Sequence, residues 1–490
     1  MTAGGAEVWL GIDVGTQSVR CVASDHSGRA VATGTGALRG RREGVRHEQD
    51  PGDWWTALVT ACRQATADLG GRPVRGVALC ATSGTILLTD AAGEPLTAGL
   101  MYDDARAVAE ADRAVAGGAA LWDSLGYRPQ PSWALPKLMW LLTNTPDRPA
   151  GARLAHQADH LTGRLTGTPT AADSSHALKT GYDLDGERWP ADLLAVLGVP
   201  DGVLPPVVRP GTPIGTVAAD SPTGLPAGTP VVAGMTDGCA ALLGAGTLEV
   251  GSWNTVLGTT LVVKGVTARR PHDPLGVVYS HRGPDDTWLP GGASSVGAGA
   301  LTARFGGRDL AELDASCARR PHTTLSTYPL VSPGERFPFA AADAHAITVG
   351  EARDEVDGYA AILRGVAFTE RLCLDYLDLL GAPVGGTLSL TGGGAKSRYW
   401  CQLRADTLGR QVRVPRGADP AAGMALLARA AGSSLVAAAR DLVRDHELID
   451  PDPAQRDVLT EGYLAMVGAL HDRGWLPDEL AVHATARSNR

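Results

Sequence analysis

The sequence predicts an α/β fold built as two similar lobes. Segments with strand patterns alternate with segments with amphipathic helix patterns along most of the 490 residues. An apolar strand, a Gly-Thr turn and a second apolar strand occur at residues 10–25 and again at 251–266, about half the chain apart. Two such hairpins can also arise by coincidence, but the chain is long enough for two or three domains with separate cores.

The N-terminal elements begin with a hairpin. Residues 7–12 and 19–24 alternate between apolar and polar, and the turn-like segment 13–18 joins them. A third strand follows in "HSGRAVATG". Residues 53–69 are predicted to form a helix capped by Asp53, and the strands "VRGVALC" and "TILLTD" come next. The apolar face of that helix consists of Trp54, Ala57, Leu58, Ala61 and Ala65.

The middle and C-terminal elements continue the alternation. Residues 230–246 are predicted to form a buried strand, a glycine-flanked turn and a small-residue helix. Residues 357–381 predict a long helix that Gly381 ends. The stretch "TLSLTGGGAKSRYWCQLRADTLG" predicts a strand, a glycine turn and a helix, and an Ala-rich helix follows Gly423.

Composition excludes several classes of function. A net charge of -9 and a pI near 5.7, without a run of Lys and Arg, argue against nucleic acid as a partner. The seven cysteines form no CxxC pair, which argues against a zinc site and a disulfide framework. The N-terminus lacks the pattern of a signal peptide, and no apolar run is long enough to span a membrane. We therefore expect a cytoplasmic protein without a membrane partner.

The first Gly-Thr turn has the chemistry of a phosphate site. A backbone that approaches phosphate oxygens needs glycine where it faces the ligand. The N–H groups around Gly15, Thr16 and Gln17 could supply such a cradle, and Asp13 could hold a Mg²⁺ ion that neutralises the phosphates. A simple hairpin turn explains the same residues equally well.

Two further glycine turns could complete a nucleotide site. Gly258, Thr259 and Thr260 would add backbone N–H groups from the second lobe, so that two hairpins clamp a phosphate pair. The cluster at residues 392–394 would let a flat adenine lie against backbone, with Ala395 and Ser397 at its rim. It lacks the GxGxxG spacing of a dinucleotide site and could equally be a tight strand-to-helix turn.

Asp237 is the candidate general base. It follows a buried strand in "GMTDG", with glycines nearby that leave room for a substrate. Asp is also a favoured N-cap, so a cap of the helix predicted at 238–246 is the alternative, and one side chain can fill both roles.

Five motifs occur in an order that resembles the FGGY carbohydrate kinases, the sugar-kinase branch of the actin-like ATPase fold. "GIDVGTQSVR" resembles the first phosphate motif, "MYDDAR" the WxDxR sugar-binding stretch and "GMTDG" the catalytic-base motif. "LGTT" is similar to the second phosphate motif and "LTGGGAKSRYWCQLRADTLGRQV" to the adenosine motif. The resemblance covers residues 8–470. It implies a two-lobed, ribonuclease H-like fold with a central cleft, ATP and Mg²⁺ as cofactors, a sugar- and base-carrying domain at 1–247 and an ATP-binding domain at 248–490.

The resemblance also implies roles for individual residues. It makes Asp237 the general base and Asp13 the organiser of metal and phosphate, with both carboxylates near the metal. It places Asp104 and Arg106 on sugar hydroxyls, although without the family a surface ion pair explains them better. The implied nucleotide-binding residues are Gly15, Thr16, Gln17, Gly258, Thr259, Thr260, Gly297, Gly393, Gly394, Ala395 and Ser397.

Departures from the family pattern bear on the substrate. Xylulose kinases usually have a GQMHG-like segment where this chain has "ATSGT", and a Trp where it has Tyr102. Thr82 or Ser83 would then replace Gln and His as hydroxyl partners. The stretch "TSGTILLTDAAGEPLTAGLMYDDAR" resembles the D-ribulose kinase-like branch of the family more closely. This resemblance implies phosphorylation of the terminal hydroxyl of D-ribulose, with D-xylulose or another polyol as the alternative. A sugar sensor with weak catalysis is the alternative of another class, and a homodimer is left open.

Overall fold

The computed structural model describes residues 7–320, 325–442 and 445–488, which form two compact units. The first unit contains the chain up to Leu248, together with His281–Trp288 and the segment that begins at Ala418. The second contains Glu249–Ser280, Leu289–Gly417 and the segment that begins at Asp445. Each unit therefore combines segments that are remote in the sequence.

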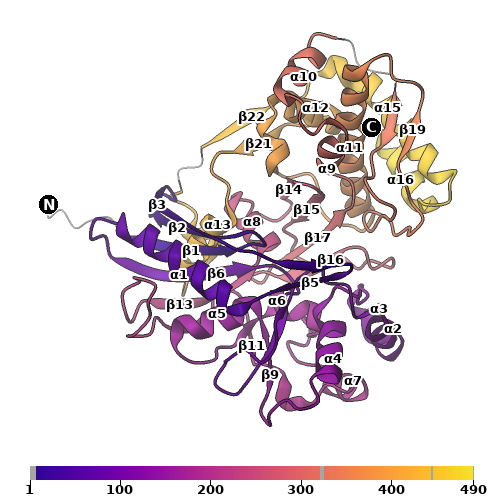
Figure 1. The fold of residues 1–490 in the computed structure, drawn as a ribbon. Coiled ribbons are helices and arrows are strands. Elements are labelled where there is room, and N and C mark those ends of the chain that lie inside the picture. Colours follow the sequence, from indigo (N-terminus) through magenta and orange to yellow (C-terminus); the bar gives the residue numbers. More distant parts are fainter. Residues whose placement is uncertain (1–6, 321–324, 443–444, 489–490) are drawn as a thin grey trace. The chain divides into compact units, whose positions relative to one another are not determined.

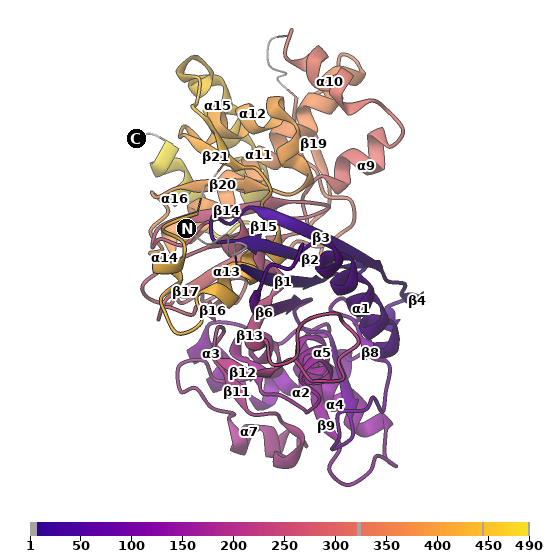
Figure 2. The same cartoon turned by 90° about the vertical axis from the view of Figure 1, so that its left-hand side faces the viewer.

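A six-stranded sheet forms the centre of the first unit (Figures 1 and 2). Its three middle strands are parallel, because β13 pairs with β6 and β6 with β1 in that direction, whereas the outer pairings are antiparallel. The strand order is β12 (Pro213–Thr216), β13 (Pro230–Thr236), β6 (Val74–Ala81), β1 (Val8–Val14), β2 (Ser18–Asp25) and β3 (Ala30–Ala37).

The predicted N-terminal elements are confirmed, with one correction. β1 and β2 form the hairpin, β3 is the third strand, and the helix predicted at 53–69 is α1 (Pro51–Ala67). Its N-cap is Asp50, whose Oδ1 accepts a hydrogen bond of 2.8 Å from the N–H of Gly52. The prediction of Asp53 as the cap is wrong, because Pro51 fits the first helical position and places the helix start two residues earlier.

A smaller five-stranded sheet lies beside α5 (Gln157–Thr166) in the first unit, and it holds the strand predicted from "TILLTD" as β7. Its order is β4 (Arg41–Glu43), β5 (Arg46–Gln49), β8 (Gly99–Leu100), β7 (Ile86–Thr89) and β9 (Arg153–His156).

A helix from late in the chain packs against the first sheet. α13 (Pro420–Arg429), drawn in yellow-orange beside the indigo β1 in Figure 1, also contacts α8 (Asp237–Gly244). A Cβ atom on Gly11 of β1 would lie 1.7 Å from the carbonyl oxygen of Ala421, so glycine permits this close approach. The Ala-rich helix begins before Gly423, not after it as predicted, because Asp419 caps it and Pro420 starts it.

A seven-stranded sheet dominates the second unit. β14 is parallel to β20 and β20 to β21, and β14 and β15 form the predicted second hairpin. The order is β16 (Tyr279–Arg282), β17 (Trp288–Ser294), β15 (Leu261–Gly265), β14 (Trp253–Leu257), β20 (Leu388–Thr391), β21 (Val412–Pro415) and β22 (His446–Ile449).

The long predicted helix of the second unit is α11 (Glu355–Leu379), followed by Gly381 in the left-handed conformation with φ +79°. A fully buried ion pair connects it to α12 (Arg398–Leu408). Arg404 donates to both carboxylate oxygens of Glu370 at 2.6 and 2.7 Å, and to the Oγ1 of Thr255 at 2.6 Å. This network joins two helices and β14 around one charge pair.

All seven cysteines are free and buried, which agrees with their prediction as small core residues. Among the described residues, no helix is both long and apolar enough to cross a membrane.

Candidate functional site

The two predicted catalytic carboxylates lie at the ends of neighbouring parallel strands in the first unit. Asp13 is near the end of β1 and pairs in register with Cys80 of β6, which in turn pairs with Met235 of β13. Asp237 follows β13 directly as the first residue of α8. Only one strand separates the two aspartates, which is why carboxylates 224 positions apart in the printed sequence interact electrostatically.

Burial and a second negative charge make ionisation of Asp13 unfavourable. Burial raises the pKa of Asp13 most, Asp237 raises it further, and together they bring it to about 7. The thiol of Cys80 donates to Oδ1 of Asp13 at 3.4 Å, which opposes the shift in part. The site therefore concentrates negative charge that a bound cation would relieve.

Asp419 is a third carboxylate at this site, and our sequence analysis missed it. Its side chain caps α13 and accepts from the N–H of Ala421 at 2.8 Å. Oδ2 also lies 2.6 Å from Nε of Arg20, the residue opposite Asp13 in the β1–β2 hairpin. The sequence "GADPAAG" signals a capped helix start, but nothing local shows that this helix packs against β1.

Asp237 begins α8 and is not its N-cap. Thr236 is the N-cap residue of α8, and Oδ1 of Asp237 accepts from the N–H of Gly238 at 2.7 Å. Asp237 is therefore in the first helical turn, where the helix dipole favours a negative charge. The simple N-cap interpretation is wrong in detail, and the role of Asp237 as general base stays a prediction.

The turn between β1 and β2 is tight. The N–H of Gly15 donates to the carbonyl of Ser18 at 3.0 Å, which closes the hairpin. The carbonyl of Thr16 accepts from Nε2 of Gln49 at 2.8 Å, so Gln49 holds the turn from the neighbouring sheet. The structure places Gly15, Thr16 and Gln17 beside Asp13, and their contact with phosphate stays a prediction.

Thr82 and Ser83 follow β6 at the same end of the sheet as Asp13. The hydroxyl of Thr82 lies 2.5 Å from that of Thr85 and donates to Oε1 of Gln157 at 3.0 Å. Nζ of Lys179 donates to the carbonyl of Ser83 at 3.2 Å. Thr82 is therefore buried in an internal network, and Gln157 and Lys179 are additional polar residues at this position that sequence reasoning missed.

Asp104 and Arg106 form an internal pair rather than the surface ion pair that was the alternative. Arg106 donates to both oxygens of the fully buried Asp104, and its Nη2 also donates to Glu48 at 2.7 Å. Burial alone would raise the pKa of Asp104, but the hydrogen bonds from Arg106 outweigh it and hold that pKa below its ordinary value. Asp104 also accepts from the N–H of His47 at 2.7 Å. A direct contact of Asp104 with sugar stays a prediction and would require some of these bonds to be replaced.

In the second unit, the structure brings together the residues of the predicted second phosphate turn. The N–H of Gly258 donates to the carbonyl of Thr260 at 3.0 Å between β14 and β15. The N–H of Ala298 donates to the carbonyl of Gly258 at 2.9 Å. A Cβ atom on Gly297 would lie 2.4 Å from the carbonyl oxygen of Thr259, so Gly297 allows its loop to lie against the turn.

The predicted adenosine turn follows β20, the parallel neighbour of β14. Gly392 has φ +82°, and a Cβ atom there would lie 2.6 Å from the carbonyl oxygen of Leu257. The turn of Gly393, Gly394 and Ala395 therefore packs directly beside the end of β14. Ser397 caps α12 through a 2.9 Å bond from the N–H of Trp400 and donates to Asp314 at 2.6 Å. Two glycine turns thus lie at the carboxyl ends of adjacent parallel strands, where α/β folds commonly bind ligands.

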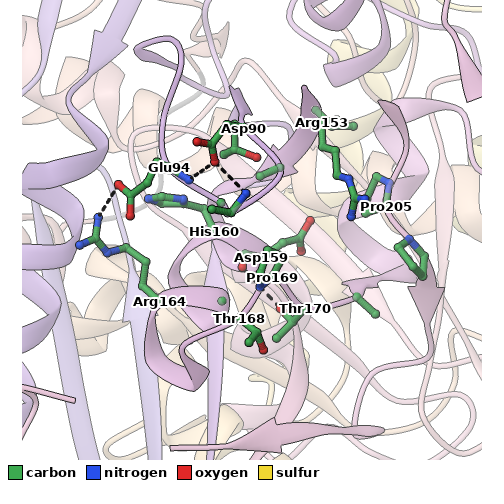
Figure 3. A pocket seen from close by; sticks show the side chains of 18 of the residues that line it. Asp90, Glu94, Arg153, Asp159, His160, Arg164, Thr168, Pro169, Thr170 and Pro205 are labelled. Atoms are coloured by element: carbon green, nitrogen blue, oxygen red, sulfur yellow. Dashed lines mark hydrogen bonds and ion pairs between the residues drawn. The ribbon is translucent and has the colours of Figure 1, made fainter. Parts of the chain in front are cut away.

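The first unit also contains a cavity of about 320 Å³, and Figure 3 shows side chains that line it. The 90–94 turn, α5 and the 167–171 loop form its walls, with Arg153 and Pro205 on another side. None of the predicted site residues is among the described residues that line it. Burial lowers the pKa of His160 in its wall to about 4, so this imidazole is neutral at pH 7.

Comparison with known proteins identifies the family. Residues 8–244 match the N-terminal domain of the FGGY family of carbohydrate kinases, and residues 253–432 match the C-terminal domain. The chain is 31% identical to a xylulose kinase of Streptomyces rubiginosus, over 88% of this chain and 89% of that protein. It is 30% identical to an autoinducer-2 kinase of Yersinia enterocolitica, over 83% and 82%.

A crystal structure of xylulose kinase from Rhodospirillum rubrum is similar to this structure, with a TM-score of 0.85 and 25% identity over 95% of this chain and 99% of that one. The predicted α/β class, the two-lobed actin-like ATPase fold and the activity of a sugar kinase are therefore confirmed. The chain belongs to the FGGY family of carbohydrate kinases.

Proposed function

We propose that this carbohydrate kinase transfers the γ-phosphoryl group of Mg·ATP to the terminal hydroxyl of a free ketopentose. The observation that carries the proposal is the position of Asp13 and Asp237 at the ends of β1 and β13. They are close enough that Asp237 raises the pKa of Asp13. A kinase needs one carboxylate near the metal and phosphates and another to accept the hydroxyl proton.

The residues present fit a magnesium ion. Mg²⁺ usually takes one or two protein carboxylates and completes its shell with waters and phosphate oxygens. Asp13 and Asp237 supply two carboxylates, which leaves the other positions of the shell to water and to phosphate oxygens of the nucleotide. This agrees with an ion shared with the nucleotide. When bound, the ion would neutralise phosphate charge.

In the proposed reaction, Asp237 accepts the proton of the sugar hydroxyl as that oxygen forms a bond to the γ-phosphorus. The bond from phosphorus to the β,γ-bridging oxygen breaks, and ADP leaves with the electron pair. The N–H groups of the Gly15–Gln17 turn and of the Gly258–Thr260 turn are the proposed phosphate donors. The turn at 392–395 is the proposed adenosine contact.

Two observations favour different ketopentoses. The departures at Thr82, Ser83 and Tyr102 favour D-ribulose, whereas the relatives matched over most of the chain are named xylulose kinases and autoinducer-2 kinases. The relatives match this chain over most of its length, whereas the D-ribulose hypothesis depends on a few positions. We therefore place D-xylulose first and keep D-ribulose as the second candidate.

A panel of sugars tests the proposal. Release of ADP from Mg·ATP is measured with D-xylulose, D-ribulose, L-ribulose, glycerol, gluconate and autoinducer-2 in turn. We expect kcat/KM to be highest for one of the two D-ketopentoses. A higher value for a compound that is not a ketopentose would contradict the substrate class. If a sugar binds but no compound of the panel leads to release of ADP, the result would instead favour a sugar sensor with weak catalysis.

A further inference from the structure

A short buried segment beside the candidate catalytic site contains three polar side chains that are linked by hydrogen bonds and that the proposed reaction does not use. Asp173 ends β10 (Ala172–Asp173), and Ser175 and His176 belong to the following helical turn α6 (Ser174–Ala177). Ser175 and His176 are fully buried and Asp173 is 3% exposed. Burial of three such groups is costly unless each finds hydrogen-bond partners.

The hydrogen bonds of this segment form one directional network. Asp173 accepts at Oδ1 from the hydroxyl of Ser175 at 2.5 Å, and its Oδ2 lies 2.6 Å from Nδ1 of His176. Because the hydroxyl proton of Ser175 points to Asp173, a lone pair of Oγ accepts from the N–H of Thr236 at 2.9 Å. Nε2 of His176 lies 3.2 Å from the carbonyl oxygen of Ala81.

His176 is a double donor in this arrangement. Both of its partners, a carboxylate and a carbonyl, can only accept, so both ring nitrogens carry protons. Burial opposes this charge, but Asp173 outweighs it and raises the pKa of His176 above its ordinary value. The result is a buried ion pair whose charges each have further hydrogen bonds.

The network connects the two strand ends on which the candidate chemistry depends. Thr236 and Ala81 are the last register partners of β13 and β6, and Asp237 and Thr82 come directly after them. The register of β13 on β6 shifts between Val232 and Met235. Side chains of the 173–176 segment therefore fix the two strand ends just beyond that irregularity.

We infer that Ser175, held by the Asp173–His176 pair, is a positioning residue for Asp237. Its hydroxyl fixes the peptide immediately before the proposed base, and a displacement of about 1 Å at a reacting group can cost a large factor in rate. This inference rests on the proposed function, because it assigns Ser175 an effect on kcat that acts through Asp237.

Ser174 provides a matched control for the test. It is also a buried serine of the same helical turn, but none of the described residues forms a hydrogen bond with its Oγ. Replacement by alanine removes the same atom at both positions, and only Ser175→Ala removes the acceptor for Thr236. We expect Ser175→Ala to lower kcat by about tenfold, with KM for sugar and for ATP within about twofold of the wild-type values. Ser174→Ala is expected to keep kcat within about twofold.

Two further measurements separate positioning from a general loss of structure. Binding of ATP without sugar involves no proton transfer, so Ser175→Ala should keep the dissociation constant for ATP. In the Asp237→Asn background, Ser175→Ala should lower kcat no further, because its effect acts through the missing carboxylate.

Each outcome bears on one claim. A kcat for Ser175→Ala equal to that of Ser174→Ala, or a full additional tenfold loss in the Asp237→Asn background, would overturn the inference. An Asp237→Asn variant with near-normal turnover would instead overturn the assignment of the base in the proposed function, whatever Ser175→Ala does.

Discussion

At the scale of single residues, Asp13 shows how a functional charge conflicts with stability. Ionisation of the half-buried Asp13 beside Asp237 is costly even though the thiol of Cys80 donates to the carboxylate, and the raised pKa of Asp13 expresses that cost. The unfolded chain ionises the same group near the ordinary value of 3.8. Folding therefore becomes less favourable as pH rises from about 4 to about 7, and the loss is complete above the folded pKa.

Asp13→Asn should consequently stabilise the metal-free protein at high pH. At pH 8 in EDTA we expect a gain of about 2 to 4 kcal/mol, because asparagine avoids the buried charge and can still accept from Cys80. At pH 4 the gain should vanish, since Asp13 is then protonated in the folded protein. Thermal melting of both proteins at the two pH values checks this, and an equal difference at both would disprove the explanation.

At the scale of elements, the packing of α13 on β1 depends on glycine. Gly11 faces the carbonyl of Ala421 at a distance that excludes any Cβ atom, and Gly423 of the helix similarly faces the carbonyl of Ala240 in α8. This packing places Asp419 near Asp13. Sequence patterns predicted the strand and a helix near these positions, but they could not show that the two pack together.

Gly11→Ala should therefore be strongly destabilising. The added methyl group must displace α13, which we expect to cost about 3 kcal/mol or more. Gly202→Ala is the control, because a Cβ atom there meets open space and φ lies outside the left-handed range. Urea unfolding of the two variants provides the comparison, and similar midpoints would contradict the close approach.

The buried ion pair of Glu370 and Arg404 in the second unit allows the cost of a buried charge to be measured. Glu370→Ala leaves Arg404 buried without its carboxylate, and we expect a loss of about 3 to 5 kcal/mol. Arg398 lies on α12, as Arg404 does, and pairs with Glu447 at the surface. Arg398→Ala should therefore cost about 0 to 1 kcal/mol. Unfolding measured by circular dichroism checks both values, and equal losses would show that burial does not determine the cost.

At the scale of the whole molecule, the sequence predicted individual strands and helices better than the contacts between remote segments. Both hairpins, α11 and the strand before Asp237 are where periodicity predicts them, because each pattern is local. The N-cap of α1 is Asp50 and not Asp53, because Pro51 occupies the first position of the helix. The contributions of Asp419, Gln157 and the Asp173–His176 pair could not be predicted, since each depends on contacts between segments remote in the chain.

The proposed role of Asp237 as the general base of a sugar kinase leads to a clear expectation for one variant. Asp237→Asn keeps the size of the side chain but removes the proton acceptor. We expect kcat to fall by about 10² to 10⁴, while the affinity for the sugar, measured by calorimetry, stays nearly unchanged. A kcat of the variant within about threefold of the wild-type value would show that Asp237 is not the general base.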